Sequence, residues 1–214
     1  MNPNASSEMP QMSRTCFDFR TLTARQRYKL MIGTIIPRPI ALVTTVDENG
    51  RVNAAPFSFF NCLSADPPIV ALGVENNPDM SFKDTGHNIR MTEVFTVNIV
   101  SFAIAEQMHV CAAKYPRDVD ELEKARLTAM PGVTVACPWI REAPAAFECR
   151  RHLTLELGRS RQIVLGEILF AHYRDGVVGE SLHVDPASVD AIARLGGDTC
   201  ATVRDRFEML TPKV

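Results

Sequence analysis

"PRPIALVTTVDENGRVNAAPF", residues 37–57, is the stretch that decides the fold. Its two prolines exclude a helix, because proline lacks an amide hydrogen and forces the residue before it into extended geometry. The residues that follow, 40–46, are rich in β-branched side chains, which favour strands. Asn49-Gly50 then forms the dipeptide typical of a tight β-hairpin turn. We therefore predict that residues 51–55 pair back onto residues 40–46.

Other strand-like segments outnumber the helical ones. Strands are expected at 69–74 and 94–100 and in the long runs 146–158 and 162–178, with bends at Gly158 and Gly166. Helices are expected over 23–33, 102–114 and 117–127, and from Pro186 to just before Gly196. Because strands and helices do not alternate, a parallel sheet is disfavoured. The pattern favours an antiparallel barrel or sandwich with a few inserted helices.

Length and composition indicate one globular domain. The chain has 214 residues, of which 46% are hydrophobic and 22% are charged, as in an ordinary soluble protein that buries a sizeable core. We predict a single domain over residues 16–214. The polar residues 1–15 have no apolar signal core and are expected to form a disordered tail.

Charge and cysteine usage exclude several classes of protein. A net charge of -2 offers no basic field for nucleic acid, and the apolar runs are too short to cross a bilayer. Six widely spaced cysteines without a C-x-x-C pair are typical of reduced thiols, so we expect a cytoplasmic protein. Cys149 and His152 have the spacing of half a metal site, but no second half follows, and we expect no metal.

Common catalytic signatures are missing from the sequence. It has no phosphate-binding P-loop, no dinucleotide fingerprint, no zinc-protease helix and no nucleophile elbow, and its five histidines are scattered. We therefore name no catalytic residue and expect any difficult chemistry to come from a cofactor.

Two stretches have the residue types that a cofactor needs. "NPDMSFKDTGHN", residues 77–88, brings Lys83, Thr85 and Asn88 near a helix start that suits a phosphate; the alternative is a solvated loop with a capped turn. "PFSFFN", residues 56–61, mixes polar groups with two phenylalanines, as a planar ring with a polar edge requires; the alternative is core packing beside a turn.

The order of four motifs resembles one family. "PRPIALVTT", "APFSFFN", S-x-D-P-P and K-D-T-x-x-N-I follow one another, and similarity resumes in "LGEILFAHYRDGVV" and "RLGGDTCATVRDRFEM". From about Cys16 onward the chain resembles the flavin reductase-like, FMN-binding split-barrel family. The resemblance implies a homodimer of six-stranded, antiparallel Greek-key barrels, each with added helices and with FMN in a groove at the dimer interface.

The resemblance also implies which residues contact FMN. The segment Ser81–Asn88 would hold the phosphate, and Thr44-Thr45 with Ser58–Asn61 would lie along the flavin ring. The full set of candidates is Arg38, Thr44, Thr45, Ser58, Phe59, Phe60, Asn61, Cys62, Ser81, Lys83, Asp84, Thr85 and Asn88. Three positions depart from the family pattern: Phe82 and Thr211 replace arginines, and Cys200 replaces a tyrosine.

The implied activity is an FMN-dependent flavin reductase that takes hydride from NADH or NADPH. Reduced flavin or electrons would then pass to a partner such as an oxygenase. Two alternatives stay open at this point: an FMN electron carrier without nicotinamide turnover, and a flavoprotein oxygenase that acts on its own small substrate.

Overall fold

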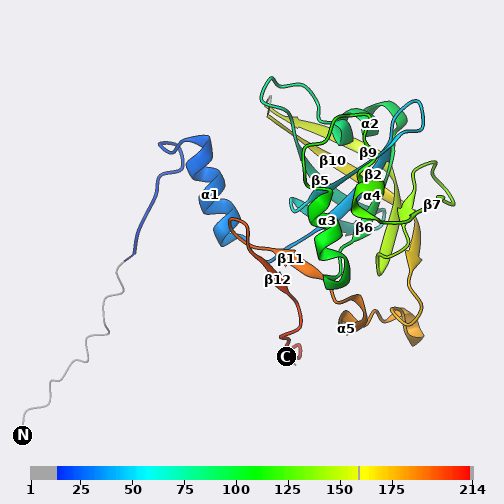
Figure 1. The fold of residues 1–214 in the computed structure, drawn as a ribbon. Coiled ribbons are helices and arrows are strands. Elements are labelled where there is room, and N and C mark those ends of the chain that lie inside the picture. Colours follow the sequence, from blue (N-terminus) through cyan, green and yellow to red (C-terminus); the bar gives the residue numbers. More distant parts are fainter. Residues whose placement is uncertain (1–13, 159, 213–214) are drawn as a thin grey trace, which may run out of the picture.

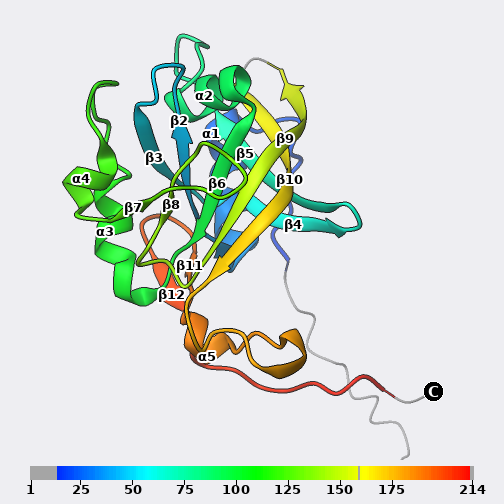
Figure 2. The same ribbon diagram turned by 90° about the vertical axis from the view of Figure 1, so that its right-hand side faces the viewer.

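A seven-stranded antiparallel sheet forms the body of the protein (Figures 1 and 2). The computed structural model describes residues 14–158 and 160–212, so the tail predicted for residues 1–15 lies almost entirely outside the described residues. The strand order is β3-β2-β6-β9-β10-β5-β4. The strands are β2 (Ala41–Val46), β3 (Val52–Phe57), β4 (Phe60–Ala65), β5 (Pro68–Glu75), β6 (Val94–Ile99), β9 (Ala145–Leu157) and β10 (Arg161–Tyr173).

The sheet is a split barrel, which confirms the predicted fold class. β3 and β4 stand at opposite ends of the strand order, yet they are one stretch of chain interrupted at Ser58 and Phe59. This stretch pairs first with β2 and then with β5, so it joins the two ends of the sheet. Taken as one bent strand, it reconciles the seven strands of the sheet with the six that the resemblance implies.

The predicted hairpin is present. Val46 pairs with Val52 and Ala41 with Phe57, so the pairing runs over the whole of β2 and β3. Gly50 has a φ of +78°, a conformation that residues with a Cβ rarely adopt. The Asp47 carboxylate accepts hydrogen bonds from the backbone N–H groups of Asn49 at 2.8 Å and Arg51 at 2.9 Å, which closes the turn.

The long β9–β10 hairpin bends at Gly166, as predicted. The register between the two strands shifts between Leu165 and Gly166. A Cβ on Gly166 would lie 2.3 Å from Cζ of the buried Phe95, so only glycine lets β10 pass over this ring. The bend therefore follows from the close approach of the backbone to a core aromatic side chain.

Two hydrophobic clusters use opposite faces of β2. Val43 packs into the barrel interior with Leu72 and Phe95, whereas Leu42 packs outward against Ile104 and Leu122 of the inserted helical segments. Side chains of successive strand residues point to opposite faces, so every residue of β2 is buried. The outer cluster, which contains Leu42, fixes α3 (Ala105–Val110) and α4 (Glu121–Ala125) against the barrel wall.

The first helix matches its prediction, but the other predicted helices are shorter than the sequence patterns indicated. The helix predicted to end at Gly33 is α1 (Ala24–Thr34), with Thr23 as its N-cap. The region 102–114 holds only the 3-10 turn η1 (Phe102–Ile104) and α3, and α4 is five residues long. The remaining ones are α2 (Asp84–Thr92), η2 (Glu180–Leu182) and α5 (Pro186–Val189). Across the described segments, no helix combines the length and the apolar character needed to span a membrane.

The helix predicted from Pro186 to Gly196 was wrong beyond its first turn. It ends at Val189, because Asp190 takes a left-handed conformation with φ +45°. The chain then forms β11 (Ile192–Arg194), which pairs with β1 (Arg38–Pro39) and β12 (Cys200–Thr202) in a small sheet. A two-stranded sheet of β7 (Ala129–Met130) and β8 (Trp139–Ile140) completes the fold.

Candidate cofactor groove

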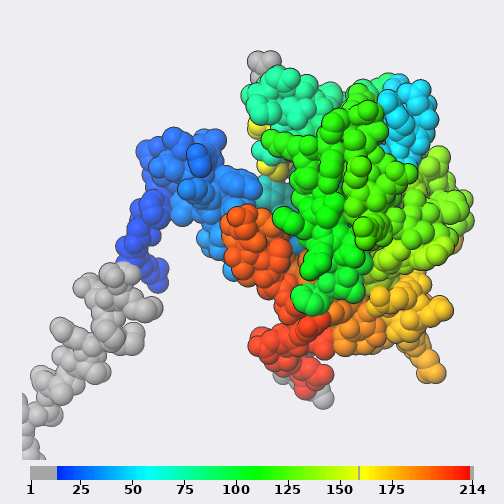
Figure 3. Space-filling model, in the orientation of Figure 1, coloured from blue at the N-terminus to red at the C-terminus, as the bar shows by residue number. Residues whose placement is uncertain are grey.

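A groove of about 620 Å³ lies beside the outer edge of β3. Ala54, Pro56 and Phe57 provide an apolar wall, and Lys83 and Thr85 contribute from the start of α2. The loop between α3 and α4 (residues 111–120) forms the opposite rim. In Figure 3 the green surface of this region meets the blue-green surface of the segment before α2. The volume is within the usual range for a cofactor site.

The N-terminus of α2 opens toward this groove with its amide groups available. Lys83 is the N-cap residue in extended geometry, and no side chain among the described residues caps the helix. The Lys83 ammonium lies 3.5 Å from Glu75 Oε2, in a pair that is exposed and therefore weak. A positively polarised helix end beside a lysine is an arrangement that binds phosphate.

The predicted phosphate residues Ser81 and Asp84 already have partners. The Ser81 hydroxyl donates a hydrogen bond to Asp79 Oδ1 at 2.6 Å and also accepts one from the side-chain amide of Asn77. Asp84 Oδ1 lies 3.3 Å from Nε of Arg117, which comes from the α3–α4 loop. Ser81 thus shapes the turn before α2, and Asp84 joins α2 to the loop on the opposite rim.

A buried polar network lies below the helix start. Asn53 donates its side-chain amide to Thr45 at 3.2 Å and to Thr85 at 3.1 Å, and Asn88 donates to Thr45 at 3.0 Å. Asn88 Oδ1 is buried and has no hydrogen-bond partner within the described part of the chain. The structure therefore brings Thr45, Thr85 and Asn88 together, and it adds Asn53. Asn53 was missed, although its position opposite Thr45 in the predicted hairpin was a usable signal.

A second, smaller hollow of about 180 Å³ adjoins the first at Phe57, Glu75 and Lys83. Ser58 and Phe59 line it, at the interruption between β3 and β4. The Phe59 ring lies 4.4 Å from the Arg161 guanidinium carbon and 6.4 Å from the Tyr28 ring. Arg161 and Tyr28 were not predicted, because they come from β10 and α1, far away in the sequence.

Eight of the thirteen candidates line neither hollow: besides Thr45, Ser81 and Asn88, these are Arg38, Thr44, Phe60, Asn61 and Cys62. Phe60 packs against the barrel core, whereas Asn61 and Cys62 are exposed on the edge strand β4, where Asn61 Oδ1 accepts a hydrogen bond from the Cys62 N–H. Arg38 is buried and donates to the carbonyl oxygens of Ile32, Ile35 and Leu195. Thr44 is buried and donates to the carbonyl of Pro138. As placed, these side chains are engaged in the fold, and their contact with a cofactor stays a prediction.

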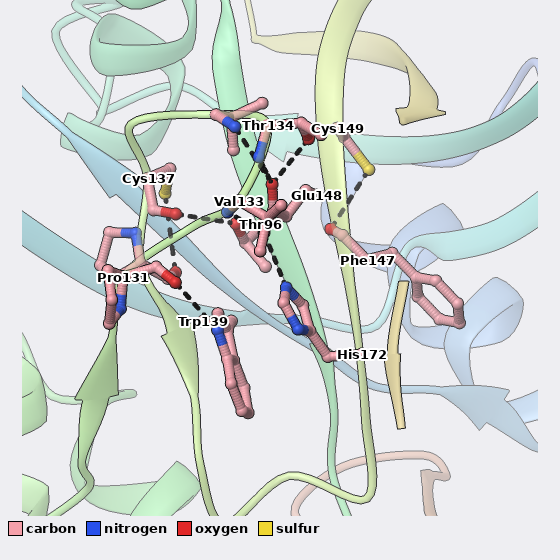
Figure 4. Close-up of polar contacts among 12 residues, drawn as sticks. Thr96, Pro131, Val133, Thr134, Cys137, Trp139, Phe147, Glu148, Cys149 and His172 are labelled. Carbon is pink, nitrogen blue, oxygen red and sulfur yellow. Dashed lines mark hydrogen bonds and ion pairs between the residues drawn. The ribbon is translucent and has the colours of Figure 1, made fainter. Parts of the chain in front are cut away.

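Glu148 anchors the β7–β8 loop to the sheet (Figure 4). Its carboxylate accepts hydrogen bonds from the backbone N–H groups of Val133 and Thr134 at 2.7 and 2.6 Å, and His172 Nε2 lies 2.7 Å from it. Burial favours the neutral acid, but these hydrogen bonds outweigh it and lower the pKa of Glu148 to about 2. The Trp139 ring stacks on His172 at 4.4 Å. None of these residues lines either hollow, so the cluster is structural.

The groove combines an anion site with an apolar wall. An uncapped helix N-terminus and a lysine suit a phosphate group, and the Ala54–Phe57 wall offers an apolar surface to a planar ring. The unpartnered carbonyl of Asn88 adds a buried acceptor below the helix start. A split barrel with such a groove defines a class of protein that can hold a planar cofactor with a phosphate group.

Comparisons with known proteins identify the family to which the chain belongs. Residues 32–193 match the family described as "Flavin reductase like domain", and the chain belongs to this family. An uncharacterised protein of Deinococcus radiodurans is 41% identical over 205 residues, covering 92% of this chain and 90% of that protein.

Two solved structures are also similar. Nitrilotriacetate monooxygenase component B of Bacillus cereus superimposes with a TM-score of 0.89 at 28% identity, covering 92% of this chain and all of that one. The 2-nitrobenzoate 2-nitroreductase NbaA of Pseudomonas fluorescens has a TM-score of 0.83 at 35% identity, covering 92% and 96%.

Proposed function

We propose that the protein is an FMN-dependent NAD(P)H:flavin oxidoreductase that supplies reduced flavin or electrons to a partner such as an oxygenase. The observation that carries this proposal is the uncapped start of α2, which opens with Lys83 into a groove of about 620 Å³. The similarity to a monooxygenase component B supports the role of an electron-supplying component.

The chain's own residues would bind and orient the cofactor. Lys83 and the first N–H groups of α2 would hold the phosphate, while Pro56 and Phe57 would contact the ring face. The buried network of Thr45, Asn53 and Asn88 keeps α2 in place against β2 and β3. When bound, FMN would supply the redox chemistry by accepting hydride from NADH or NADPH. No acid–base side chain is then required for the hydride transfer.

The proposal includes a homodimer. A groove along one barrel leaves part of a bound ring open to solvent, and a second subunit would cover it. An apolar surface is available: Leu153, Leu155 and Leu157 are 46%, 46% and 49% exposed, and they share one face of β9 because they alternate along the strand. Ile163 and Leu165 lie opposite two of them on β10. We call these five residues the leucine face.

The test follows the absorbance of NADH and NADPH when each is mixed with the purified protein and FMN. Oxidation of the nicotinamide at a rate proportional to protein concentration supports a flavin reductase. A protein that retains FMN but never consumes either nicotinamide would be the electron carrier, and the reductase proposal would then be rejected. Nicotinamide oxidation that requires an added small aromatic substrate would support the oxygenase.

A further inference from the structure

We propose that Lys114, in the α3–α4 loop, is a second phosphate-binding cation that compensates for the arginine absent at position 82. This inference rests on the proposed function, because the phosphate is that of FMN. Lys114 lines the same groove as Lys83 and Thr85 but faces it from the opposite rim. Within the described residues no acidic group lies within 4.0 Å of the Lys114 ammonium, so its charge is available to a ligand.

The cationic side chain next to Phe82 is that of Arg90, and it already has other partners. The Arg90 guanidinium lies 4.3 Å from the centre of the Phe82 ring. It also donates hydrogen bonds to Gln162 at 2.9 Å and to Glu156 at 2.6 Å. Arg90 therefore braces α2 against β9 and β10 and does not line the groove. Arg90 thus supplies no charge to the groove, whereas Lys114 lines it.

Arg117 would reduce the electrostatic repulsion between Asp84 and a phosphate bound at the start of α2. Asp84 is the first residue of α2, and its carboxylate would repel a phosphate at the helix start. Arg117 lies 3.3 Å from that carboxylate and offsets its charge. The same contact holds the α3–α4 loop close to α2, which keeps Lys114 on the rim of the groove. Lys114 and Arg117 thus act together from one loop, the first toward the ligand and the second toward Asp84.

A ligand with a dianionic phosphate suits this arrangement better than a neutral one. Two lysines and the partial positive charge of a helix end line the groove in which the phosphate would bind. The α3–α4 loop should therefore discriminate between FMN and riboflavin, which have the same ring and differ by the phosphate. Its contribution should also weaken with salt, because Lys114 is exposed.

The experiment is a fluorescence titration of the full-length protein with FMN and with riboflavin. We expect Lys114→Ala to weaken FMN binding by about tenfold at low salt and to leave riboflavin binding unchanged. Lys114→Arg keeps the charge and should retain most of the FMN affinity. Lys124→Ala is the matched control, because Lys124 is an exposed lysine on α4 that does not line the groove. Equal losses for FMN and riboflavin, or no loss of FMN affinity, would overturn the role of Lys114.

A second set of variants tests Arg117. We expect Arg117→Ala to weaken FMN binding because Asp84 is left without a nearby cation, and the double change Arg117→Ala with Asp84→Asn to recover most of that loss. A double variant as weak as Arg117→Ala would show that Arg117 does not act through the Asp84 charge. If the wild-type protein binds no flavin, this inference and the proposed function both fail. If it binds FMN and Lys114→Ala is neutral, only this inference fails.

Discussion

Asn88 of α2 donates its side-chain amide to the hydroxyl of Thr45 in β2 across 3.0 Å, and both residues are buried. This bond connects the helix at the proposed phosphate site to a central strand of the barrel. The Thr45 hydroxyl also accepts a hydrogen bond from the side-chain amide of Asn53, so it orients the amides of both Asn88 and Asn53. The position of α2, which begins at the groove, therefore depends on the hydroxyl group of Thr45.

Replacing Thr45 by valine keeps the side-chain shape and removes that acceptor. We expect Thr45→Val to lower the free energy of unfolding by about 1–3 kcal/mol, because two amide donors lose a partner in the protein interior. Urea unfolding measures this change. The matched control is Thr154→Val, because the Thr154 hydroxyl is buried without a partner in the described chain, and its loss should be neutral or stabilising. Equal destabilisation by both substitutions would contradict the role of the network.

Lys83 should distinguish flavins by their phosphate. We expect Lys83→Ala to weaken FMN binding by roughly ten- to a hundredfold, the equivalent of about 1.5–3 kcal/mol, through loss of one charge-assisted contact. Riboflavin binding should hardly change. Fluorescence titration with both ligands makes the comparison, with Lys124→Ala as the control. A similar loss for both ligands would mean that the loop before α2 is structural.

Glu148 should make stability depend on pH in the acid range. Its pKa lies near 2 in the folded protein, against an ordinary value of 4.5 for glutamate. The folded state therefore binds this proton less readily, so the contribution to stability is fully present above about pH 4.5. It is lost as the pH falls towards 2 and amounts to about 3 kcal/mol.

Glu148→Gln removes this charge and provides the test. The difference in unfolding free energy between wild type and Glu148→Gln should be largest at pH 7 and should shrink as the pH falls to 3. Urea titrations at both values measure it. Glu167→Gln is the control, because the Glu167 ion pair with Arg150 is partly exposed and contributes little. A difference that does not change with pH would disprove the anchoring role of the carboxylate charge.

The leucine face should be the subunit interface. We expect Leu155→Lys to convert a dimer into monomers in analytical ultracentrifugation, because the substitution buries an unpaired charge at an apolar contact. FMN affinity should fall when the dimer dissociates, although Leu155 does not line the groove. Leu182→Lys is the control: Leu182 is 85% exposed in η2 and lies outside the leucine face. A wild-type protein that binds FMN tightly as a monomer would rule out this interface.

Local signals predicted much of the fold. The Asn49-Gly50 turn, the two prolines before β2 and the bend at Gly166 depend on backbone geometry that few residues allow, so they can be read from the sequence. The helix from Pro186 was overestimated because its end was placed at Gly196, whereas Asp190 breaks the helix and the segment pairs with β1. That pairing connects residues 38 and 194, and no local pattern contains it.

The site was predictable only in part for the same reason. Lys83, Thr85 and Asn88 could be predicted to lie together because they are on one short segment, and the structure places all three at the start or in the first turns of α2. Lys114 and Arg161 line the hollows from other elements, and Arg117 contacts Asp84 from the α3–α4 loop, so no local sequence pattern contains them. Arg38 and Thr44 belong to a recognisable motif, but their side chains bind backbone carbonyls within the fold.

Helix α1 projects from the barrel, and each of its eleven residues remains at least partly exposed (Figure 1). A helix of this length is marginal in water unless another surface packs against it. Its backbone amides should therefore exchange with deuterium rapidly in dilute protein and become protected as the concentration rises, because subunit association would complete its folding. The hydrogen-exchange rate of α1 would then report subunit association directly, while the amides of β2 stay protected throughout.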